Sequence, residues 1–177
     1  HHVGDVELVV RVDRRQPAGQ AEFLAFYDAT FTDAYRYAGR LCGGDRDAAE
    51  DLVQDAYTSV LRQVRRDADK DLHVGYVITT IRNRFLDRVR KDEREERRLR
   101  LVAVTADDDG APEPTGSHVT SQLAALPERE RAALVLRYVD DLSVPDVAAA
   151  LGLTVHAAES LLARARTRLR GEDTRNA

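Results

Sequence analysis

The stretch TVHAAESLLARARTRLR, residues 154–170, carries the side chains whose types and spacing most clearly suggest chemistry. Four arginines fall in its second half, and Glu159 is its only acid. Arginine can pair with phosphates or donate two hydrogen bonds to guanine, whereas glutamate can accept a hydrogen bond from cytosine. The stretch therefore favours contact with nucleic acid, and Glu159 stands where a basic contact would be expected.

The residues around this stretch follow the sequence pattern of two helices joined by a tight turn. Ser143 and Asp146 can cap a short helix over VPDVAAAL. Gly152 suits the turn, and Thr154 can cap the last helix. The buried stripe predicted for that helix is Val155, Ala158, Leu162, Ala165 and Leu169. With Pro127 in the first turn of a preceding helix, the pattern predicts a helix-turn-helix domain over residues 119–171, followed by a tail at 172–177.

The face opposite that stripe would read base edges in a major groove. The residues predicted to contact DNA there are Thr154, His156, Ala157, Glu159, Ser160, Arg164 and Arg168. Arg164 can reach guanine or a phosphate, and Ser160 tolerates several bases. For Leu161 we expect packing against Arg164 or Tyr138, or contact with a thymine methyl group. The plain alternative is a helical bundle that makes no DNA contact.

A second basic segment lies at residues 82–100, which hold nine lysines or arginines against five acids. Residues 20–61 are acidic instead, with eight acids against three arginines. The net charge of −4 thus conceals an acidic module, a basic helix and a second basic helix near the end of the chain. The total argues against nonspecific coating of nucleic acid, whereas the asymmetry favours localised contacts.

Three amphipathic helices are predicted before residue 100. The first spans residues 21–42, stops at Gly43-Gly44 and buries Leu24, Tyr27, Phe31, Ala34, Ala38 and Cys42. The second is capped by Asp47, with Glu50 as a capping-box partner. Its buried stripe is Ala49, Leu52, Val53, Ala56, Tyr57, Val60 and Val64. The third begins near Tyr76 and buries Val77, Ile78, Ile81, Phe85 and Val89.

Composition and punctuation together predict an all-α protein with two small helical domains joined by a flexible linker. The chain has 177 residues, 43% of them hydrophobic, which is enough for two such domains. We expect the first domain at 20–100 and the linker at 101–118, where glycine, prolines and acids show no periodicity. Residues 1–19 are interpreted as a tag remnant and a flexible leader or partner-binding arm, which includes the strand-like VELVVRV.

Several functional classes are disfavoured by the residues present. A lone cysteine, Cys42, cannot form an internal disulfide or build a zinc site by itself, and we expect it to be a buried structural thiol. The histidines are scattered and no nucleophile lies beside a plausible base, so we expect neither an enzyme nor a cofactor or metal. No apolar run approaches the ~20 residues that span a bilayer and no signal peptide is visible, so we expect a cytoplasmic protein without a membrane span.

Three stretches of the chain resemble RNA polymerase sigma factors of the extracytoplasmic-function group. They are AEDLVQDAYTSVL (49–61), TTIRNRFLDRVRK (79–91) and LPERERAALVLRYVDDLSVPDVAAALGLTVHAAESLLARARTRLR (126–170). Their order and spacing are similar to the minimal form of the family, with region two, a short linker and region four. The resemblance implies a noncatalytic subunit that binds core RNA polymerase and directs promoter-specific initiation.

The resemblance also implies partners for the charged surfaces. The helix at 48–64 would dock on the clamp coiled coil of core polymerase through Asp51, Gln54, Asp55 and Thr58. Opposite charges across such an interface favour fast, specific association. The last helix would read the minus-35 promoter element. An anti-sigma partner would occlude these surfaces until a signal releases them.

The basic helix at 76–91 resembles the segment that captures and opens the minus-ten element. The residues implied in that contact are Tyr76, Arg82, Asn83, Arg84, Asp87, Arg88, Arg90 and Lys91. The cations can neutralise phosphates, Asn83 can meet an unstacked base edge, and the loop at 67–75 would pocket that base. Tyr76 stands where the family usually has tryptophan, and His73-Val74 replaces a phenylalanine-arginine pair. These departures leave the preferred sequence open, and Tyr76 is either a core aromatic or a base-stacking one.

Two other classes remain open. A stand-alone regulator would use only the helix-turn-helix and would bind duplex DNA without polymerase. A protein-interaction bundle would have lost DNA reading, in keeping with Glu159 and Leu161. The sigma-like segment at 49–61 distinguishes the sigma-factor interpretation from both of these alternatives. The linker acids Asp107, Asp108 and Asp109 either mimic RNA phosphates near the polymerase active centre or belong to a solvated tether.

Overall fold

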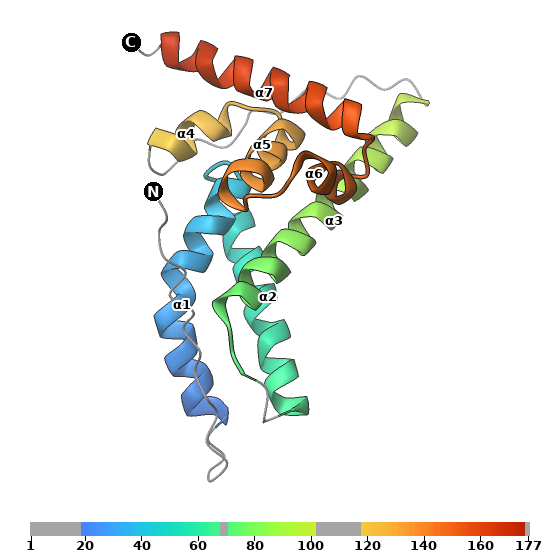
Figure 1. Cartoon of the computed structure of the whole chain (residues 1–177). Helices are drawn as coiled ribbons and strands as arrows, with labels where there is room; N and C mark the ends of the chain where they lie inside the picture. Colours follow the sequence, from blue (N-terminus) through green and yellow to red (C-terminus); the bar gives the residue numbers. More distant parts are fainter. Residues whose placement is uncertain (1–18, 68–70, 102–117, 176–177) are drawn as a thin grey trace.

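The computed structural model describes residues 19–67, 71–101 and 118–175, and every regular element in these ranges is helical. Figure 1 shows one group of helices from the first half of the chain and a second group from the last third. The prediction of an all-α protein with two small helical domains is confirmed. The strand-like residues 6–12 and the predicted linker acids lie outside the described residues.

The N-terminal domain consists of α1 (Gly19–Leu41), α2 (Arg46–Arg66) and α3 (Val74–Arg100), which pack against one another. The buried face of α2 matches the predicted stripe at every position. Tyr57 lies at its centre, and the ring centroids of Phe23 and Tyr27 lie 6.3 and 4.6 Å from its own. This aromatic cluster ties α1 to α2 by packing two partly buried rings of α1 against the buried Tyr57.

The buried face of α1 differs from the predicted one. Leu24 is 51% exposed, whereas Phe26 and Thr30 are buried. The Thr30 hydroxyl donates to the Phe26 carbonyl at 2.7 Å and shares a second hydrogen bond of 2.7 Å with the Tyr57 hydroxyl. Because its hydrogen bonds are satisfied, threonine can occupy a core position. A stripe counted from apolar residues alone misses it.

The turn between α1 and α2 uses the two glycines that were expected to end α1. Gly43 and Gly44 adopt φ angles of 61° and 83°, in the left-handed region that favours glycine. The predicted cap at Asp47 is wrong, because α2 begins at Arg46. Its cap is Asp45, whose side chain accepts a hydrogen bond from the Ala48 amide at 3.2 Å.

The C-terminal domain contains α4 (His118–Ala124), α5 (Glu128–Leu134), the π-helical turn η1 (Val135–Val139), α6 (Val144–Leu151) and α7 (Val155–Arg175). Its predicted caps and turn are confirmed, whereas Pro127, predicted in the first turn of a helix, is the N-cap residue just before α5. Ser143 Oγ accepts from the Asp146 amide at 3.2 Å, and Thr154 Oγ1 accepts from the Ala157 amide at 3.1 Å. Gly152 ends α6 with a φ of 66°. These caps fix where both helices of the pair begin.

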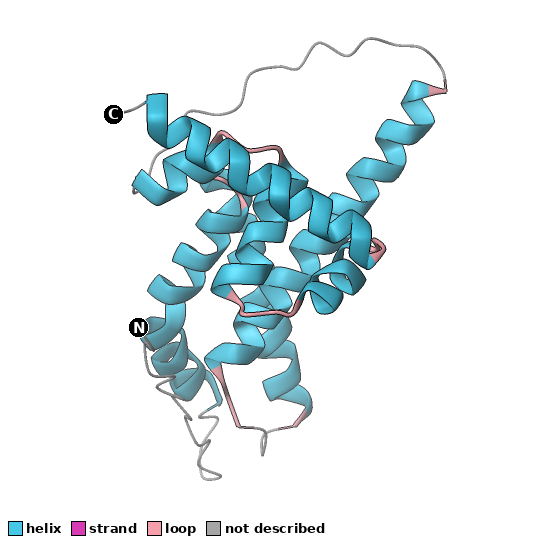
Figure 2. Ribbon diagram, turned by 45° about the horizontal axis from the view of Figure 1, so that its top comes forward, coloured by secondary structure: helices cyan, strands magenta, loops and turns pink. Residues whose placement is uncertain are grey.

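The two domains pack against each other. In Figures 1 and 2, α4 lies near the end of α1, while α5 and α6 lie against α3. Arg131 reaches from α5 to the end of α1, where its Nε donates to the Leu41 carbonyl at 2.6 Å. Buried residues of both domains form one hydrophobic cluster. The charged surfaces of the two domains are therefore held in a defined arrangement.

Candidate nucleic-acid interface

The first half of α7 presents most of its predicted base-reading residues to solvent. His156, Glu159, Ser160 and Arg164 are exposed, and Ala157 is half-buried. The axis bends by 99° between α6 and α7, an angle typical of a helix-turn-helix. The exposed face of α7 is thus free to enter a groove while α6 supports it from behind.

Leu161 belongs to the core of the C-terminal domain. Its side chain is 6% exposed, whereas Val155, which was predicted to be buried, is 44% exposed. Ala158, Leu161, Leu162 and Ala165 follow the spacing of one buried helical face, which α7 packs against α5 and α6. Leu161 is therefore not placed to touch a thymine methyl group. Glu159 remains the unusual residue on the reading face.

Three arginines of α7, Arg164, Arg166 and Arg168, differ in their contacts. Arg166 donates to the Tyr138 hydroxyl at 3.0 Å. The Nε of Arg168 lies 3.4 Å from Oε2 of Glu130, a carboxylate that is only 4% exposed. These two cations brace α7 against α5 and η1, whereas Arg164 projects into solvent. Arg168 thus pairs with a buried acid in addition to its predicted DNA contact.

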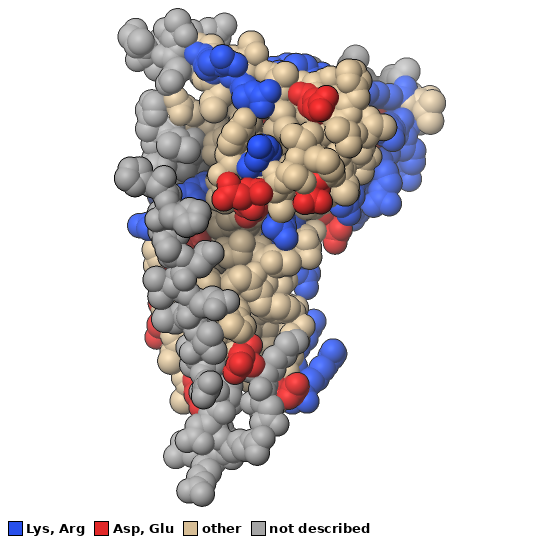
Figure 3. All heavy atoms as spheres, viewed as in Figure 1, with Lys and Arg blue, Asp and Glu red and all other residues tan. Residues whose placement is uncertain are grey.

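Four of the predicted minus-ten residues lie on exposed positions of α3: Asn83, Arg84, Asp87 and Lys91. The row formed by residues 83, 87 and 91 continues to Arg94 and Arg98 at helical spacing, and both are exposed. Figure 3 shows lysine and arginine side chains gathered toward the C-terminal end of α3. This face can accept an extended, negatively charged backbone.

Three other predicted minus-ten residues contact the C-terminal domain instead of solvent alone. Arg82 Nη1 lies 3.9 Å from Oδ2 of Asp140, and Arg88 Nη2 lies 3.6 Å from Oε1 of Glu128. Arg90 donates through Nη2 to the carbonyl of Ala150. The structure therefore divides the predicted cluster into an exposed row and a row that contacts α5, α6 and the residue at the C-terminal end of η1.

Asp140 is the most perturbed carboxylate at this contact. Its Oδ2 accepts a hydrogen bond of 2.7 Å from the Tyr37 hydroxyl. Burial raises the pKa of Asp140, and the opposing effects of the Tyr37 hydrogen bond and the Arg82 charge are smaller. Burial and the neighbouring Asp140 also raise the pKa of Tyr37 above its usual range. Keeping Asp140 ionised at this buried position therefore costs desolvation free energy.

The predicted polymerase-contacting residues form an exposed row on α2: Asp51, Gln54, Asp55 and Thr58. The Thr58 hydroxyl donates to the Gln54 carbonyl at 2.8 Å. Asp55 Oδ2 lies 3.8 Å from Arg84 Nη1, and both side chains are well exposed, so this ion pair is weak. The acidic row of α2 therefore adjoins the basic row of α3.

Tyr76 is half-buried at the start of α3. Gln63 donates through Nε2 to its hydroxyl. Both residues line a pocket of about 100 Å³ together with Val60, Val64, Asp71, Leu72 and His73. The pocket includes the described end of the loop that was predicted to hold a flipped base. Tyr76 can thus pack in the wall of a recess and still meet a base at its mouth.

An apolar groove on the C-terminal domain was not predicted. It has a volume of about 410 Å³ and is lined by Leu123, Leu134, Val135, Tyr138, Val139, Leu169, Arg166 and Arg170. Tyr138 and Val139 are exposed at its edge. The sequence signal was the run ALVLRYV, which holds more apolar residues than one buried helix face requires. Such a groove suits the apolar face of a partner helix.

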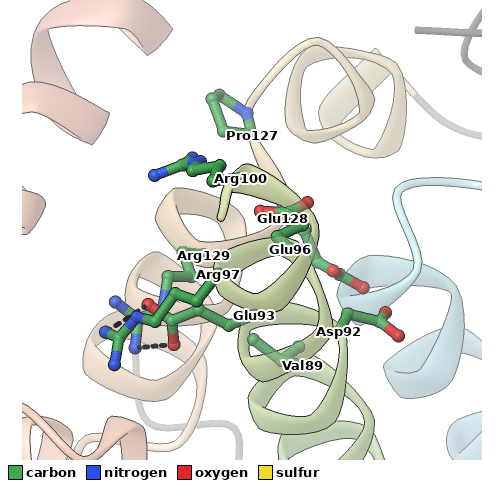
Figure 4. A pocket seen from close by; sticks show the side chains of 9 residues that line it. All are labelled: Val89, Asp92, Glu93, Glu96, Arg97, Arg100, Pro127, Glu128 and Arg129. Carbon is green, nitrogen blue, oxygen red and sulfur yellow. Dashed lines mark hydrogen bonds and ion pairs between the residues drawn. The ribbon is translucent and has the colours of Figure 1, made fainter. Parts of the chain in front are cut away.

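A second hollow lies between the domains. It has a volume of about 370 Å³. Figure 4 shows its lining residues on the last turns of α3 and the start of α5. Glu93 is bonded there to Arg129 at 2.7 Å and to Arg97 at 3.2 Å. Charges of both signs converge on this hollow, so it marks the rim of the contact between domains.

The described residues offer little for other chemistry. They contain no group of three or more histidine, cysteine or acidic side chains that could hold a metal ion. Cys42 is buried, as expected, and burial raises the pKa of its thiol. No single helix in the described ranges is long and apolar enough to cross a membrane, and only the bent pair α6–α7 meets that test when taken together.

Two sequence-family models match the chain. Sigma-70 region 2 matches residues 26–95, and Sigma-70 region 4 matches residues 119–169. A protein named ECF RNA polymerase sigma factor SigE, from Mycolicibacterium smegmatis, is 32% identical over 148 residues, which is 77% of this chain and 55% of that protein. The chain thus spans about half the length of this curated relative.

Two solved structures overlap most of the chain at 25% identity. The sigma factor RpoE in complex with the anti-sigma factor NepR, from Bartonella quintana, overlaps 86% of this chain and 94% of its own, with a TM-score of 0.47. CnrH in complex with the cytosolic domain of CnrY overlaps 89% of this chain and 91% of its own, with a TM-score of 0.48.

Proposed function

The chain belongs to the sigma-70 family of RNA polymerase sigma factors, with regions 2 and 4 ordered as in the extracytoplasmic-function group, and we propose that it directs promoter-specific transcription initiation by core RNA polymerase. The proposal rests on one observation. The same chain presents an exposed acidic row on α2 and, on α7, an exposed face that could read DNA. The protein supplies specificity rather than catalysis and acts in the cytoplasm.

Core polymerase binds the α2 row of Asp51, Gln54, Asp55 and Thr58. The row is exposed and acidic, and it rests on a fully buried stripe that holds it rigid. A basic coiled coil on the polymerase would complement it, which speeds association and fixes its register. The apolar groove between α4, α5 and α7 offers a second surface, suited to a helix of polymerase or of an anti-sigma protein.

Promoter DNA binds two separate surfaces. The first half of α7 reads the minus-35 element in the major groove, where Glu159 favours cytosine and Arg164 favours guanine or a phosphate. The basic side of α3 holds the opened minus-ten strand, with Asn83 reading a base edge and the recess near Tyr76 receiving an unstacked base. An anti-sigma protein, implied by the family resemblance, completes the set of partners.

The polymerase contact is tested by reversing two charges. Asp51→Lys with Asp55→Lys places two cations opposite a basic partner, and like charges facing each other cost several kcal/mol, so affinity for core polymerase should fall by roughly a hundredfold. Binding is measured by fluorescence titration with purified core enzyme. The matched control is Asp28→Lys with Asp33→Lys on α1, which makes the same charge change on exposed residues.

The expected result is lost binding for the α2 variant, retained binding for the control and unchanged helicity for both by circular dichroism. Equal affinity for both variants would remove α2 from the interface. The wild-type chain should also let core polymerase start at discrete sites on fragmented genomic DNA. Duplex binding without polymerase, and no initiation with it, would favour a stand-alone regulator.

A further inference from the structure

We propose that Glu130, a buried acid of α5, is a positioning residue that orients Arg168 of α7 toward a phosphate of duplex DNA. The inference rests on the proposed function in treating α7 as the helix that reads the minus-35 element. Glu130 itself touches no DNA in this arrangement. It acts through Arg168, whose contact is a phosphate rather than a base.

Glu130 is buried to a degree that no other charged residue in the described ranges reaches, with only 4% of its surface exposed. Its Oε2 accepts no hydrogen bond within those ranges. A carboxylate in such a place costs free energy unless a countercharge lies beside it, and an apolar side chain of similar volume often packs there at least as stably. The Nε of Arg168, 3.4 Å from Oε2, supplies the countercharge. Packing alone therefore does not explain why an acid stands at this position.

Arg168 lies where the exposed face of α7 meets the buried face. It follows the exposed Arg164 by four residues, so the two arginines share one edge of the exposed face. The Arg168 side chain is 54% exposed although its Nε lies beside a buried acid. In the described ranges, no hydrogen bond or ion pair engages its Nη1 or Nη2. Because the guanidinium is a rigid planar fork, holding Nε at Glu130 also sets the direction of these two free donor groups.

The position of Arg168 along α7 suits a contact with the DNA backbone. Arg168 follows Ser160, one of the predicted base-reading residues, by about 12 Å along the helix axis, at a rise of ~1.5 Å per residue. The major groove is about 12 Å wide, so a helix with Ser160 at the bases brings Arg168 to the sugar-phosphate backbone at the edge of the groove. Figure 1 shows α7 lying across α5, so Glu130 supports Arg168 from the side away from the DNA. A phosphate contact there fixes the register of the helix without reading sequence.

The contribution of Glu130 to DNA affinity comes from fixing Arg168 before the DNA arrives. A mobile arginine loses rotamer freedom when its guanidinium is immobilised on a phosphate, and that loss opposes binding. Arg168 has already lost part of this freedom in the free protein, because its Nε is held at the buried carboxylate. Removing the acceptor at position 130 should therefore weaken duplex binding by about threefold to tenfold, the range for ordering one long side chain.

The experiment compares Glu130→Met with Glu130→Gln in the full chain. Methionine fills a similar volume without an oxygen, whereas glutamine keeps an acceptor for the Nε of Arg168. Affinity for two short DNA duplexes of unrelated sequence is measured by fluorescence anisotropy across a salt series. Electrostatics alone predicts tighter binding for both variants, because each removes a negative charge. Positioning predicts weaker binding for Glu130→Met only, and Glu50→Met is the matched control because it removes the same charge at an exposed position of α2.

Substitutions of Arg168 test whether Glu130 acts through it. Arg168→Ala should reduce the slope of log affinity against log salt by about 0.9, the value for one lost phosphate contact on a duplex, and by the same amount for both sequences. Arg168→Lys keeps the charge, but a single ammonium cannot replace a fork that meets a carboxylate and a phosphate at once, so it should restore only part of the affinity. Adding Glu130→Met to Arg168→Ala should cause no further loss, because the contact that Glu130 supports is already gone.

The expected result is weaker duplex binding for Glu130→Met than for Glu50→Met, binding near that of the wild type for Glu130→Gln, and no added loss in the double variant. If urea unfolding shows that Glu130→Met does not fold, Glu130→Asp takes its place, since it keeps the charge and withdraws the carboxylate from Arg168.

Equal affinity for Glu130→Met and Glu50→Met would overturn the inference. An equal loss with and without Arg168 would also overturn it, because Glu130 would then only brace α7, and a loss on one duplex alone would exclude a phosphate contact. Initiation by the wild-type chain with core polymerase tests the proposed function separately. Initiation with no effect of Glu130→Met on duplex binding would sink the positioning role alone, whereas the reverse pattern would sink the sigma function alone.

Discussion

Leu161→Ala is expected to destabilise the protein by about 3 kcal/mol. The side chain is 6% exposed and packs in the core beneath α7, so the substitution loses nearly all of its burial and leaves a cavity. Fully buried leucines cost about 2.7–5 kcal/mol when cut to alanine. The residual exposure and the good helix propensity of alanine place this site toward the low end of that range.

The measurement is urea unfolding of the full chain followed by circular dichroism, with the midpoint and slope compared with the wild type. Leu24→Ala is the matched control, because Leu24 is 51% exposed and should cost less than about 1 kcal/mol. Promoter choice by core polymerase should be unchanged in both variants. A cost below about 1 kcal/mol for Leu161→Ala, together with an altered base preference at one promoter position, would refute its placement in the core.

Two further predictions concern Glu159 and Asp140. Glu159→Gln should shift discrimination at one base pair of the minus-35 element by about 1–3 kcal/mol in duplex binding, with stability unchanged, because the side chain is exposed; a uniform loss across all sequences would contradict a base contact. Because burial raises the pKa of Asp140, its stabilising contribution is present at low pH and is lost as pH rises through its folded pKa. Asp140→Asn, which stays neutral and keeps an acceptor for Tyr37, should therefore be at least as stable as the wild type at pH 7. The difference in unfolding free energy between Asp140→Asn and the wild type should shrink toward pH 4. A difference that grows on acidification would contradict this prediction.

Local rules predicted the buried face of α2. Its stripe was predicted at every position, because its buried residues follow one helical period even though the helix packs against both α1 and α3. The caps at Ser143 and Thr154 were also predicted, since a cap depends on side chains within three residues. The predicted stripe of α7 was wrong at one position. Leu161 lies three residues after Ala158 and is buried with it, whereas Val155, at the first turn of the helix, is 44% exposed.

The candidate sites show the same division. Exposure of Asp51 and Glu159 followed from the helical period, because each lies opposite a predicted core stripe. The ion-pair partner of Arg82 could not be predicted, since it depends on how the C-terminal domain packs on α3. The partner of Arg82, Asp140, lies 58 residues away in sequence, at the end of η1. No periodicity connects two such positions.

The arrangement of α3 explains why one helix carries more cations than a single contact requires. One face packs into the core, a second meets the C-terminal domain, and a third is open to solvent. Arginines suit the second face because a guanidinium can exchange a carboxylate or carbonyl for a phosphate without changing its geometry. On this second face Asp140 and Glu128 supply carboxylates to Arg82 and Arg88.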